Sequence, residues 1–417
     1  MGFVRAMARR GLSLTMALLV AGAYVTLNPV AFFPVAAAAI IVLWLTSESL
    51  PRRSSILPAS VGLLLCIGPL LLSLLLNGGE SKDYLVPAAI GLLGGAACRL
   101  GAAAEDDVRF GRACSVGALA ALIAFVSVML VRGWNIPGAI LSGVRLETGV
   151  HPNYLGLLAL ASLTLAVMSG RRWVIAVAAV AAVAQCLAVS SRAALLTTLL
   201  LIALSVWRER ALILRRPILL ISGFLAVLGL GLAFGGAASE LVQRVFLVAD
   251  PYRGLASGGS GRLVIWSSFL DLWAEHPVLG AGPSTTVTIA GEQLYSHNML
   301  VDLLVEVGVL GLVAFLGYVL LALKAATAPH VGRTLSRACV AVVLCYFAYG
   351  LFEGRGLNIG NPLSCLFFLV TFMTIGRAYS GPSRRPVLED PTSPGVWRNR
   401  SPRSARRPPP TRTPSAF

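Results

Sequence analysis

Three cationic residues stand where a polar stretch of the chain meets the start of a predicted helix: Arg192, Arg262 and His297. Helix N-termini carry positive partial charge, so a cation placed there is unfavourable by about 0.3–1 kcal/mol. A bound anion would offset that cost, because arginine side chains and the free N–H groups of a helix start together make a phosphate site. We therefore predict that the three residues converge on the diphosphate of a lipid-linked substrate.

Each of these cations also has a plainer explanation, and all three stay open at this point. Arg192 could extend from a helix end toward the membrane surface, and Arg262 could be a solvated loop charge. His297 could be an interfacial histidine whose ring nitrogens are hydrogen-bonded to neighbouring groups. Their joint placement favours a shared ligand, because three separate explanations would otherwise be needed.

Four further polar residues are candidates for substrate contact: His151, Asn298, Asp302 and Glu306. Asp302 and Glu306 follow His297 by about one and two helical turns, on a similar face. They could orient His297, hold a substrate hydroxyl or line a proton path. His151 lies at the predicted outer mouth of the apolar run that begins at Pro152.

The elements that must position these residues are membrane-spanning helices. The chain is 57% hydrophobic and 12% charged, whereas soluble domains contain about 25% charged residues. Apolar runs of about 17–25 residues recur along it, each long enough to cross a hydrocarbon core. A backbone in lipid satisfies its hydrogen bonds only in helices or closed barrels, and these runs are too long for barrel strands. We expect an all-α polytopic membrane protein.

We predict twelve transmembrane helices with both termini in the cytoplasm. The predicted spans are 11–27, 30–47, 56–77, 84–104, 112–131, 152–169, 172–190, 191–207, 217–235, 298–323, 337–353 and 361–377. In this arrangement the inner segments carry 26 lysine and arginine residues and the outer segments carry 8. That distribution follows the positive-inside rule, which supports the orientation.

The one large loop, 236–297, falls on the predicted outer side. Loops of this length in compact architectures are usually functional or disordered. An apolar stripe recurs within it at helical spacing: Trp266, Phe269, Leu270 and Trp273. His276-Pro277 ends the pattern, and the two tryptophans favour an amphipathic helix at the membrane–water interface.

The remaining composition argues against nucleic-acid and metal chemistry. The formal net charge is +16, but the basic residues follow the inner loops and a Pro-, Ser- and Arg-rich end, which we expect to be disordered near anionic lipid headgroups. The seven cysteines show no metal-ligand spacing, so no metal or other cofactor is expected. The predicted organisation is nine spans in 1–235, the outer loop 236–297, three spans in 298–377 and a basic cytoplasmic tail in 378–417.

Several short motifs occur in a fixed order around the three cations. They are Ser191-Arg192-Ala193-Ala194, Gly261-Arg262-Leu263-Val264-Ile265-Trp266, Pro277-Val278-Leu279-Gly280-Ala281-Gly282, and His297-Asn298 followed by Leu304, Glu306, Gly308 and Gly311. With the twelve spans and the large loop, they resemble the O-antigen ligase and polymerase superfamily of bacterial envelope enzymes. The resemblance is strong over about 190–312 and only topological elsewhere.

The resemblance implies a glycosyltransferase on the outer face of the bacterial cytoplasmic membrane. Such enzymes move a glycan from an undecaprenyl diphosphate-linked donor to a surface glycan or lipid acceptor, without a nucleotide sugar or metal. Carried over to this chain, Arg192 and Arg262 would stabilise the leaving diphosphate, and His297 would act as the general base. The superfamily also includes polysaccharide polymerases and protein O-oligosaccharyltransferases, which these residues do not separate.

A transporter or flippase is the alternative from another functional class. Twelve spans with both ends inside are common among secondary transporters, which typically have internal repeats and broken helices near the middle of the membrane. The chain shows no obvious repeat between its halves and few charges well inside a span. In the transporter interpretation, Asp302 and Glu306 would line the proton path.

Overall fold

The structure is a computed structural model that describes residues 2–46, 53–79, 81–103, 107–142, 144–208, 262–289, 292–354 and 357–380. Thirteen helices and one β-hairpin form these parts of the chain. The helices are α1 Gly2–Thr26, α2 Pro29–Thr46, α3 Arg53–Asn77, α4 Ser81–Ala103, α5 Asp107–Arg132, α6 Ile136–Ser142, α7 Pro152–Ser169, α8 Arg172–Ala188, α9 Arg192–Arg208, α12 Arg262–Glu275, α13 Met299–Ala326, α14 Arg333–Gly350 and α15 Pro362–Tyr379. Strands β1 Val287–Ile289 and β2 Glu292–Leu294 pair antiparallel.

The all-α membrane class is supported, whereas the number of spans is not settled by the helices. Helices occupy eleven of the twelve predicted spans. The remaining predicted span, 217–235, lies outside the described residues. Among the described helices, seven are long and apolar enough to cross a membrane: α2, α3, α4, α5, α7, α13 and α15. Apolar stretches in α1, α8 and α9 are shorter. The twelve-span count, the orientation and the outer loop therefore stay predictions.

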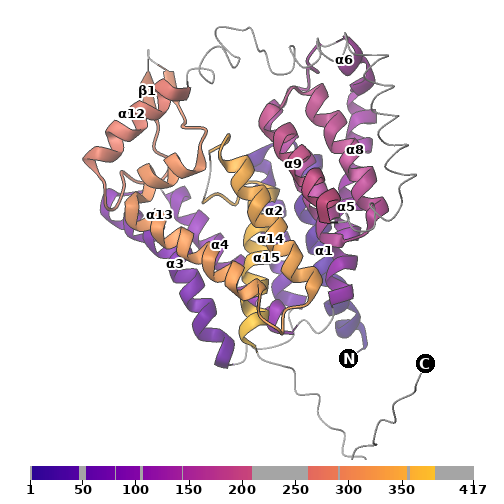
Figure 1. The fold of residues 1–417 in the computed structure, drawn as a ribbon, viewed down its shortest axis with the longest axis horizontal. Helices are drawn as coiled ribbons and strands as arrows, with labels where there is room; N and C mark the ends of the chain where they lie inside the picture. Colours follow the sequence, from indigo (N-terminus) through magenta and orange to yellow (C-terminus); the bar gives the residue numbers. More distant parts are fainter. Residues whose placement is uncertain are drawn as a thin grey trace, which may run out of the picture. The chain divides into compact units, whose positions relative to one another are not determined.

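Helix α15 lies in the middle of the bundle in Figure 1, and α7 packs against it. Helix α7 packs against α5, α8, α9 and α14, and α15 packs against α3, α4, α13 and α14. Their most apolar windows are 89% and 83% buried, compared with 28–44% in the other five long apolar helices. The peripheral helices thus turn one side inward and leave large apolar side chains exposed, as expected where lipid covers a protein.

The seven cysteines are small core residues. All seven are buried and unpaired by disulfides: Cys66, Cys98, Cys114, Cys186, Cys339, Cys345 and Cys365. They contribute packing to the bundle and do not form a cross-linked framework.

Helix α13 is interrupted at Gly308, whose φ of 68° and ψ of −173° are not helical. Residues 277–282, which we call the splint, run alongside this break. The splint donates backbone hydrogen bonds to the carbonyls of Val305 and Glu306, at 2.7 and 3.2 Å, and its own carbonyls accept bonds from the N–H groups that follow the break. Backbone groups that the interruption would leave without partners in an apolar environment are thereby satisfied.

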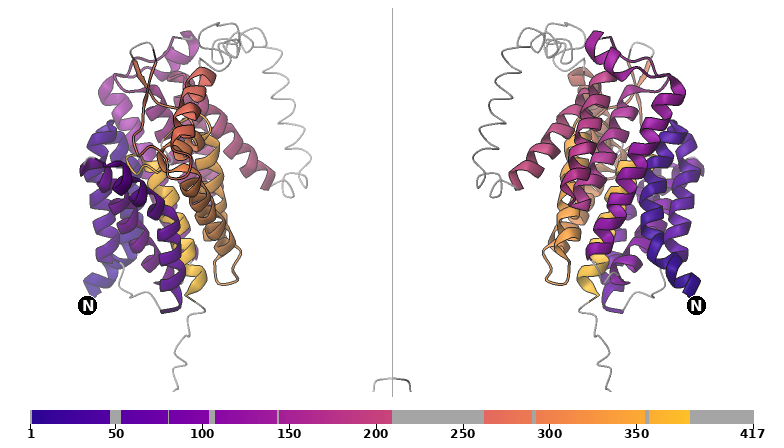
Figure 2. Two further views of the ribbon diagram at one scale, coloured as in Figure 1. Left: turned by 90° about the vertical axis from the view of Figure 1, so that its left-hand side faces the viewer. Right: turned by 90° about the vertical axis from the view of Figure 1, so that its right-hand side faces the viewer.

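Two glycines allow the splint and the broken helix to approach so closely. Gly280 and Gly308 both have positive φ, which glycine adopts without steric cost. A Cβ on Gly308 would overlap the carbonyl of Val278, and a Cβ on Gly280 would overlap the backbone of Glu306. The splint, α12 and the hairpin lie at the same end of the bundle as α6, opposite the start of α1 (Figures 1 and 2).

Candidate active site

His297 is held in an unusual backbone conformation just before α13. Its φ is 52°, in the left-handed region, which histidine occupies more readily than most residues other than glycine. Ser296 fixes the backbone on one side, because its Oγ accepts from the N–H of Asn298 at 3.0 Å and donates to Asp302 Oδ1. The indole N–H of Trp266 donates to the Ser296 carbonyl at 2.8 Å. The imidazole therefore projects from a well-anchored turn.

Asn298 is the N-cap of α13. Its side-chain oxygen accepts from the N–H groups of Leu300 and Val301, at 2.9 and 3.3 Å, as expected at a helix start. Its amide nitrogen donates to the carbonyl of Leu351 at 3.3 Å, just beyond the end of α14. This side chain thus ties the start of α13 to the segment that contains Glu353. Its predicted contact with substrate stays untested.

The ring of His297 faces a carboxylate. His297 Nδ1 lies 3.5 Å from Glu353 Oε2, and their side chains are 39% and 15% exposed. A carboxylate at Nδ1 favours the tautomer that leaves Nε2 free to accept a proton. The histidine is thus accessible to a substrate while its carboxylate partner is sheltered.

Asn153, near the start of α7, holds Glu353 from the other side. Its amide nitrogen donates to Glu353 Oε1, and its backbone carbonyl accepts from the hydroxyl of Tyr349 at 3.0 Å. Ser191 Oγ donates to Asn153 Oδ1 at a longer 3.5 Å. A continuous series of polar contacts therefore runs from Ser191, before α9, through Asn153 and Glu353 to His297, and it connects the ends of four helices.

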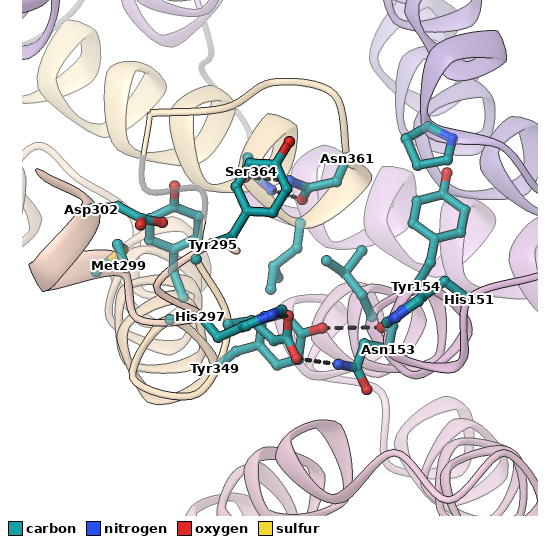
Figure 3. Close-up of a pocket in the computed structure, with 17 residues that line it drawn as sticks. His151, Asn153, Tyr154, Tyr295, His297, Met299, Asp302, Tyr349, Asn361 and Ser364 are labelled. Carbon is teal, nitrogen blue, oxygen red and sulfur yellow. Dashed lines mark hydrogen bonds and ion pairs between the residues drawn. The ribbon is translucent and has the colours of Figure 1, made fainter. Parts of the chain in front are cut away.

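A cavity of about 320 Å³ opens beside these groups. In Figure 3, His297, Asn153 and Tyr349 gather on one side of it, Asp302 and Met299 lie on a second side, and Tyr154 and His151 approach from α7. The predicted residues His151, His297 and Asp302 thus line a common space. Its size is within the range typical of ligand sites.

The two arginines lie at the predicted helix starts but do not line this cavity. Arg192 is the first residue of α9 and Arg262 the first of α12. Both are half-buried, and each belongs to an element that is hydrogen-bonded to the site, through Ser191 and Trp266 respectively. The convergence of both arginines with His297 on one diphosphate stays a prediction.

A helix lies where the apolar stripe of the predicted loop indicates one, at α12. Phe269 of that stripe is buried, the indole of Trp266 donates to the Ser296 carbonyl, and α12 packs on α13. Leu270 of the same stripe is exposed, as are Leu263 and Val264. The stripe is therefore only partly covered by the protein, and the amphipathic, interfacial role of α12 stays a prediction.

Sequence reasoning missed four residues that shape this site: Asn153, Tyr295, Tyr349 and Glu353. Glu353 had one available signal, since it is a carboxylate at the predicted outer end of a span in a chain with only 18 acidic residues. Nothing in the linear sequence pairs it with His297. In the described parts of the chain, no group of three or more His, Cys, Asp or Glu residues could hold a metal ion.

Residues 177–316 match the model of the family described as O-antigen ligase. This range contains Arg192, Arg262, His297, the splint and the break in α13. The resemblance to the O-antigen ligase and polymerase superfamily is therefore confirmed over this segment. No curated protein matches the chain at a significant level. The family match and the long apolar helices together support a membrane enzyme of the ligase or polymerase type.

Proposed function

We propose that the protein, whose segment 177–316 matches the O-antigen ligase family, is a metal-independent membrane glycosyltransferase of the bacterial cytoplasmic membrane. It moves a glycan from an undecaprenyl diphosphate-linked donor to a surface glycan or lipid acceptor, on the outer face. The observation that carries this proposal is the pairing of His297 with Glu353 at the edge of a cavity. A base oriented by a carboxylate is what activation of an acceptor hydroxyl requires.

In the proposed reaction, the acceptor hydroxyl attacks the anomeric carbon of the donor sugar. His297 Nε2 takes the hydroxyl proton as the new carbon–oxygen bond forms. The bond between the anomeric carbon and the phosphate oxygen breaks, its electron pair stays with undecaprenyl diphosphate, and the anomeric configuration inverts. Arg192 and Arg262 stabilise the negative charge that grows on the leaving group.

The arginine roles predict a strong loss of donor cleavage in Arg192→Ala and Arg262→Ala. Removing one group that stabilises developing charge costs about 10²–10³-fold in kcat. The assay is release of undecaprenyl diphosphate by purified protein supplied with lipid-linked glycan from the source organism, with and without EDTA. We expect wild type to be insensitive to EDTA. Arg145→Ala is the matched control, because Arg145 is exposed and on the predicted outer side. Donor cleavage by Arg192→Ala and Arg262→Ala at the rate of Arg145→Ala would contradict the roles of the two arginines.

The carboxylate role predicts a smaller loss in Glu353→Gln. The glutamine carbonyl can still accept from Asn153, but the negative charge that faces His297 is gone. Loss of a partner that orients a functional histidine typically costs about 10–100-fold. We expect kcat to fall and the donor KM to stay within about twofold of wild type. The control is Glu292→Gln, which changes an exposed carboxylate of β2. If Glu353→Gln transfers glycan as fast as Glu292→Gln, Glu353 does not support His297 in the reaction.

The transporter interpretation has one observation in its favour, the interruption of α13 at Gly308. Broken helices near ion sites are typical of transporters. In this chain, however, the splint pairs with backbone groups on both sides of the break. Counterflow of labelled glycolipid in vesicles, without formation of a glycan product, would favour transport. If the protein is a transferase, the mass shift of the acceptor distinguishes a ligase from a polymerase.

A further inference from the structure

Asn153 contacts the end of α14 at two points (Figure 3). Its backbone carbonyl accepts from the hydroxyl of Tyr349 at 3.0 Å, and its amide nitrogen donates to Glu353 Oε1. Tyr349 and Glu353 lie one helical turn apart, since the N–H of Glu353 donates to the carbonyl of Tyr349 at 3.1 Å. The start of α7 therefore holds both the turn that precedes Glu353 and the carboxylate itself.

The contact with Asn153 determines which oxygen of Glu353 faces the histidine. Asn153 binds Oε1, whereas His297 Nδ1 lies 3.5 Å from Oε2. The last torsion of a glutamate side chain is broad, so a carboxylate bound at one oxygen alone is free to turn. The amide of Asn153 restricts the carboxylate to the orientation that places the proton of His297 on Nδ1.

The amide of Asn153 is itself oriented from α9. Ser191, the residue before this helix, is buried, and its Oγ donates to Asn153 Oδ1 at 3.5 Å. The amide can meet both neighbours in one orientation, with its oxygen toward the hydroxyl and its nitrogen toward the carboxylate. The contact with Ser191 and the contact with Glu353 therefore support each other.

Close packing of α7 on the start of α9 keeps these groups in place. Gly156 lies one turn beyond Asn153, and a Cβ on Gly156 would overlap the side chains of Ser191 and Ala194. Tightly packed interiors are poorly compressible and transmit a displacement from one element to the next. The position of the start of α9 therefore sets the position of Asn153.

We propose that Asn153 is a positioning residue, which is oriented by Ser191 and aligns Glu353 with His297. This inference rests on the proposed transferase function, in which His297 is the general base. The orientation of the base thus depends on the helix that begins at Arg192, the arginine proposed to bind the donor.

The test replaces Asn153 with leucine, which has the same branched shape and forms no hydrogen bonds, alone and together with Glu353→Gln. Asn153→Leu alone should lower kcat for glycan transfer about tenfold, as for the loss of a group that orients a functional histidine. In the Glu353→Gln background the same change should have almost no further effect, because the charge that Asn153 orients is already gone. A merely structural role would make the two losses multiply.

Ser191→Ala is a milder second variant, since it removes only the hydroxyl. We expect kcat to fall about threefold, the cost of one hydrogen bond between neutral groups, and this loss should also vanish in the Glu353→Gln background. The control is Asn135→Ala, because Asn135 is an exposed asparagine that precedes α6 and does not line the cavity beside His297. It should keep the wild-type kcat.

A second readout does not require transfer. In protein with ¹⁵N-labelled histidine, at a pH at which the rings are neutral, the signals of the four histidines report which ring nitrogen carries the proton. The signal that is lost in His297→Asn identifies His297. Asn153→Leu and Glu353→Gln should both raise the share of the tautomer with the proton on Nε2.

An unchanged His297 signal in Asn153→Leu overturns the inference, as does a double variant in which the two losses of kcat multiply. Failure of the proposed function is distinguishable from both results. In that case wild type releases no undecaprenyl diphosphate, whereas the tautomer of His297 still responds to Asn153→Leu.

Discussion

Replacing His297 with asparagine is expected to lower the rate of glycan transfer by about 10²–10⁴-fold, the usual contribution of a general base. Asparagine is the informative replacement, because residue 297 has a φ of 52° and asparagine tolerates this left-handed region well. The side chain cannot take the hydroxyl proton, so loss of rate in a folded protein reports on chemistry. Transfer kinetics with saturating donor measure the effect.

The matched control for this variant is His276→Asn. His276 is an exposed histidine at the end of α12 and does not line the cavity beside His297. We expect it to keep wild-type activity. A His297→Asn variant that elutes as a folded protein and retains more than about a tenth of the wild-type rate would be incompatible with a general base at this position.

A second large effect is expected for Gly308→Ala, which we expect to destabilise the fold. Alanine at a positive φ stores about 1–3 kcal/mol of strain, and its Cβ would overlap the Val278 carbonyl, which costs a further 1–3 kcal/mol or so. The splint would be pushed from α13. We expect a lower melting temperature in detergent and loss of transfer, since the splint is bonded to α13, which begins just after His297 and Asn298.

Gly317→Ala is the control for this substitution, as it adds the same methyl group to the same helix. Gly317 is helical, and a Cβ there would meet only side-chain atoms of Leu65, at 3.8 Å or more. Alanine in a helix interior is favoured over glycine by about 0.5–1 kcal/mol, so stability should be unchanged or slightly higher. Equal melting temperatures for the two alanine variants would mean that the break and splint do not support the fold.

Helix boundaries near the site were predictable because local chemistry sets them. Helices α8 and α9 are separated by a tight turn at Ser190, whose φ is 56°. The sequence predicts this turn because Arg192 interrupts an otherwise apolar run. The end of α12 coincides with His276-Pro277 because proline cannot continue a helix. These signals come from neighbouring residues, so they can be recognised in a single sequence without knowledge of the fold.

Features that depend on distant partners were not predictable. Helix α14 begins at Arg333, earlier than the predicted span, because the Asp107 carboxylate of α5 accepts from the N–H groups of Thr334 and Leu335, at 2.7 and 3.1 Å. The break at Gly308 exists because the splint supplies partners from another segment. The Glu353 carboxylate reaches His297 only through the packing of α14 beside α13.

The measurement that tests the central claim most directly is the ratio of products formed by purified wild-type protein in detergent. Lipid-linked donor and acceptor glycan are supplied together, with EDTA present, and both products are quantified by mass spectrometry. The account predicts one undecaprenyl diphosphate released for each glycan attached to the acceptor, with inverted anomeric configuration. A folded protein that leaves the donor intact across several donors, or that yields product with retained configuration, would contradict it.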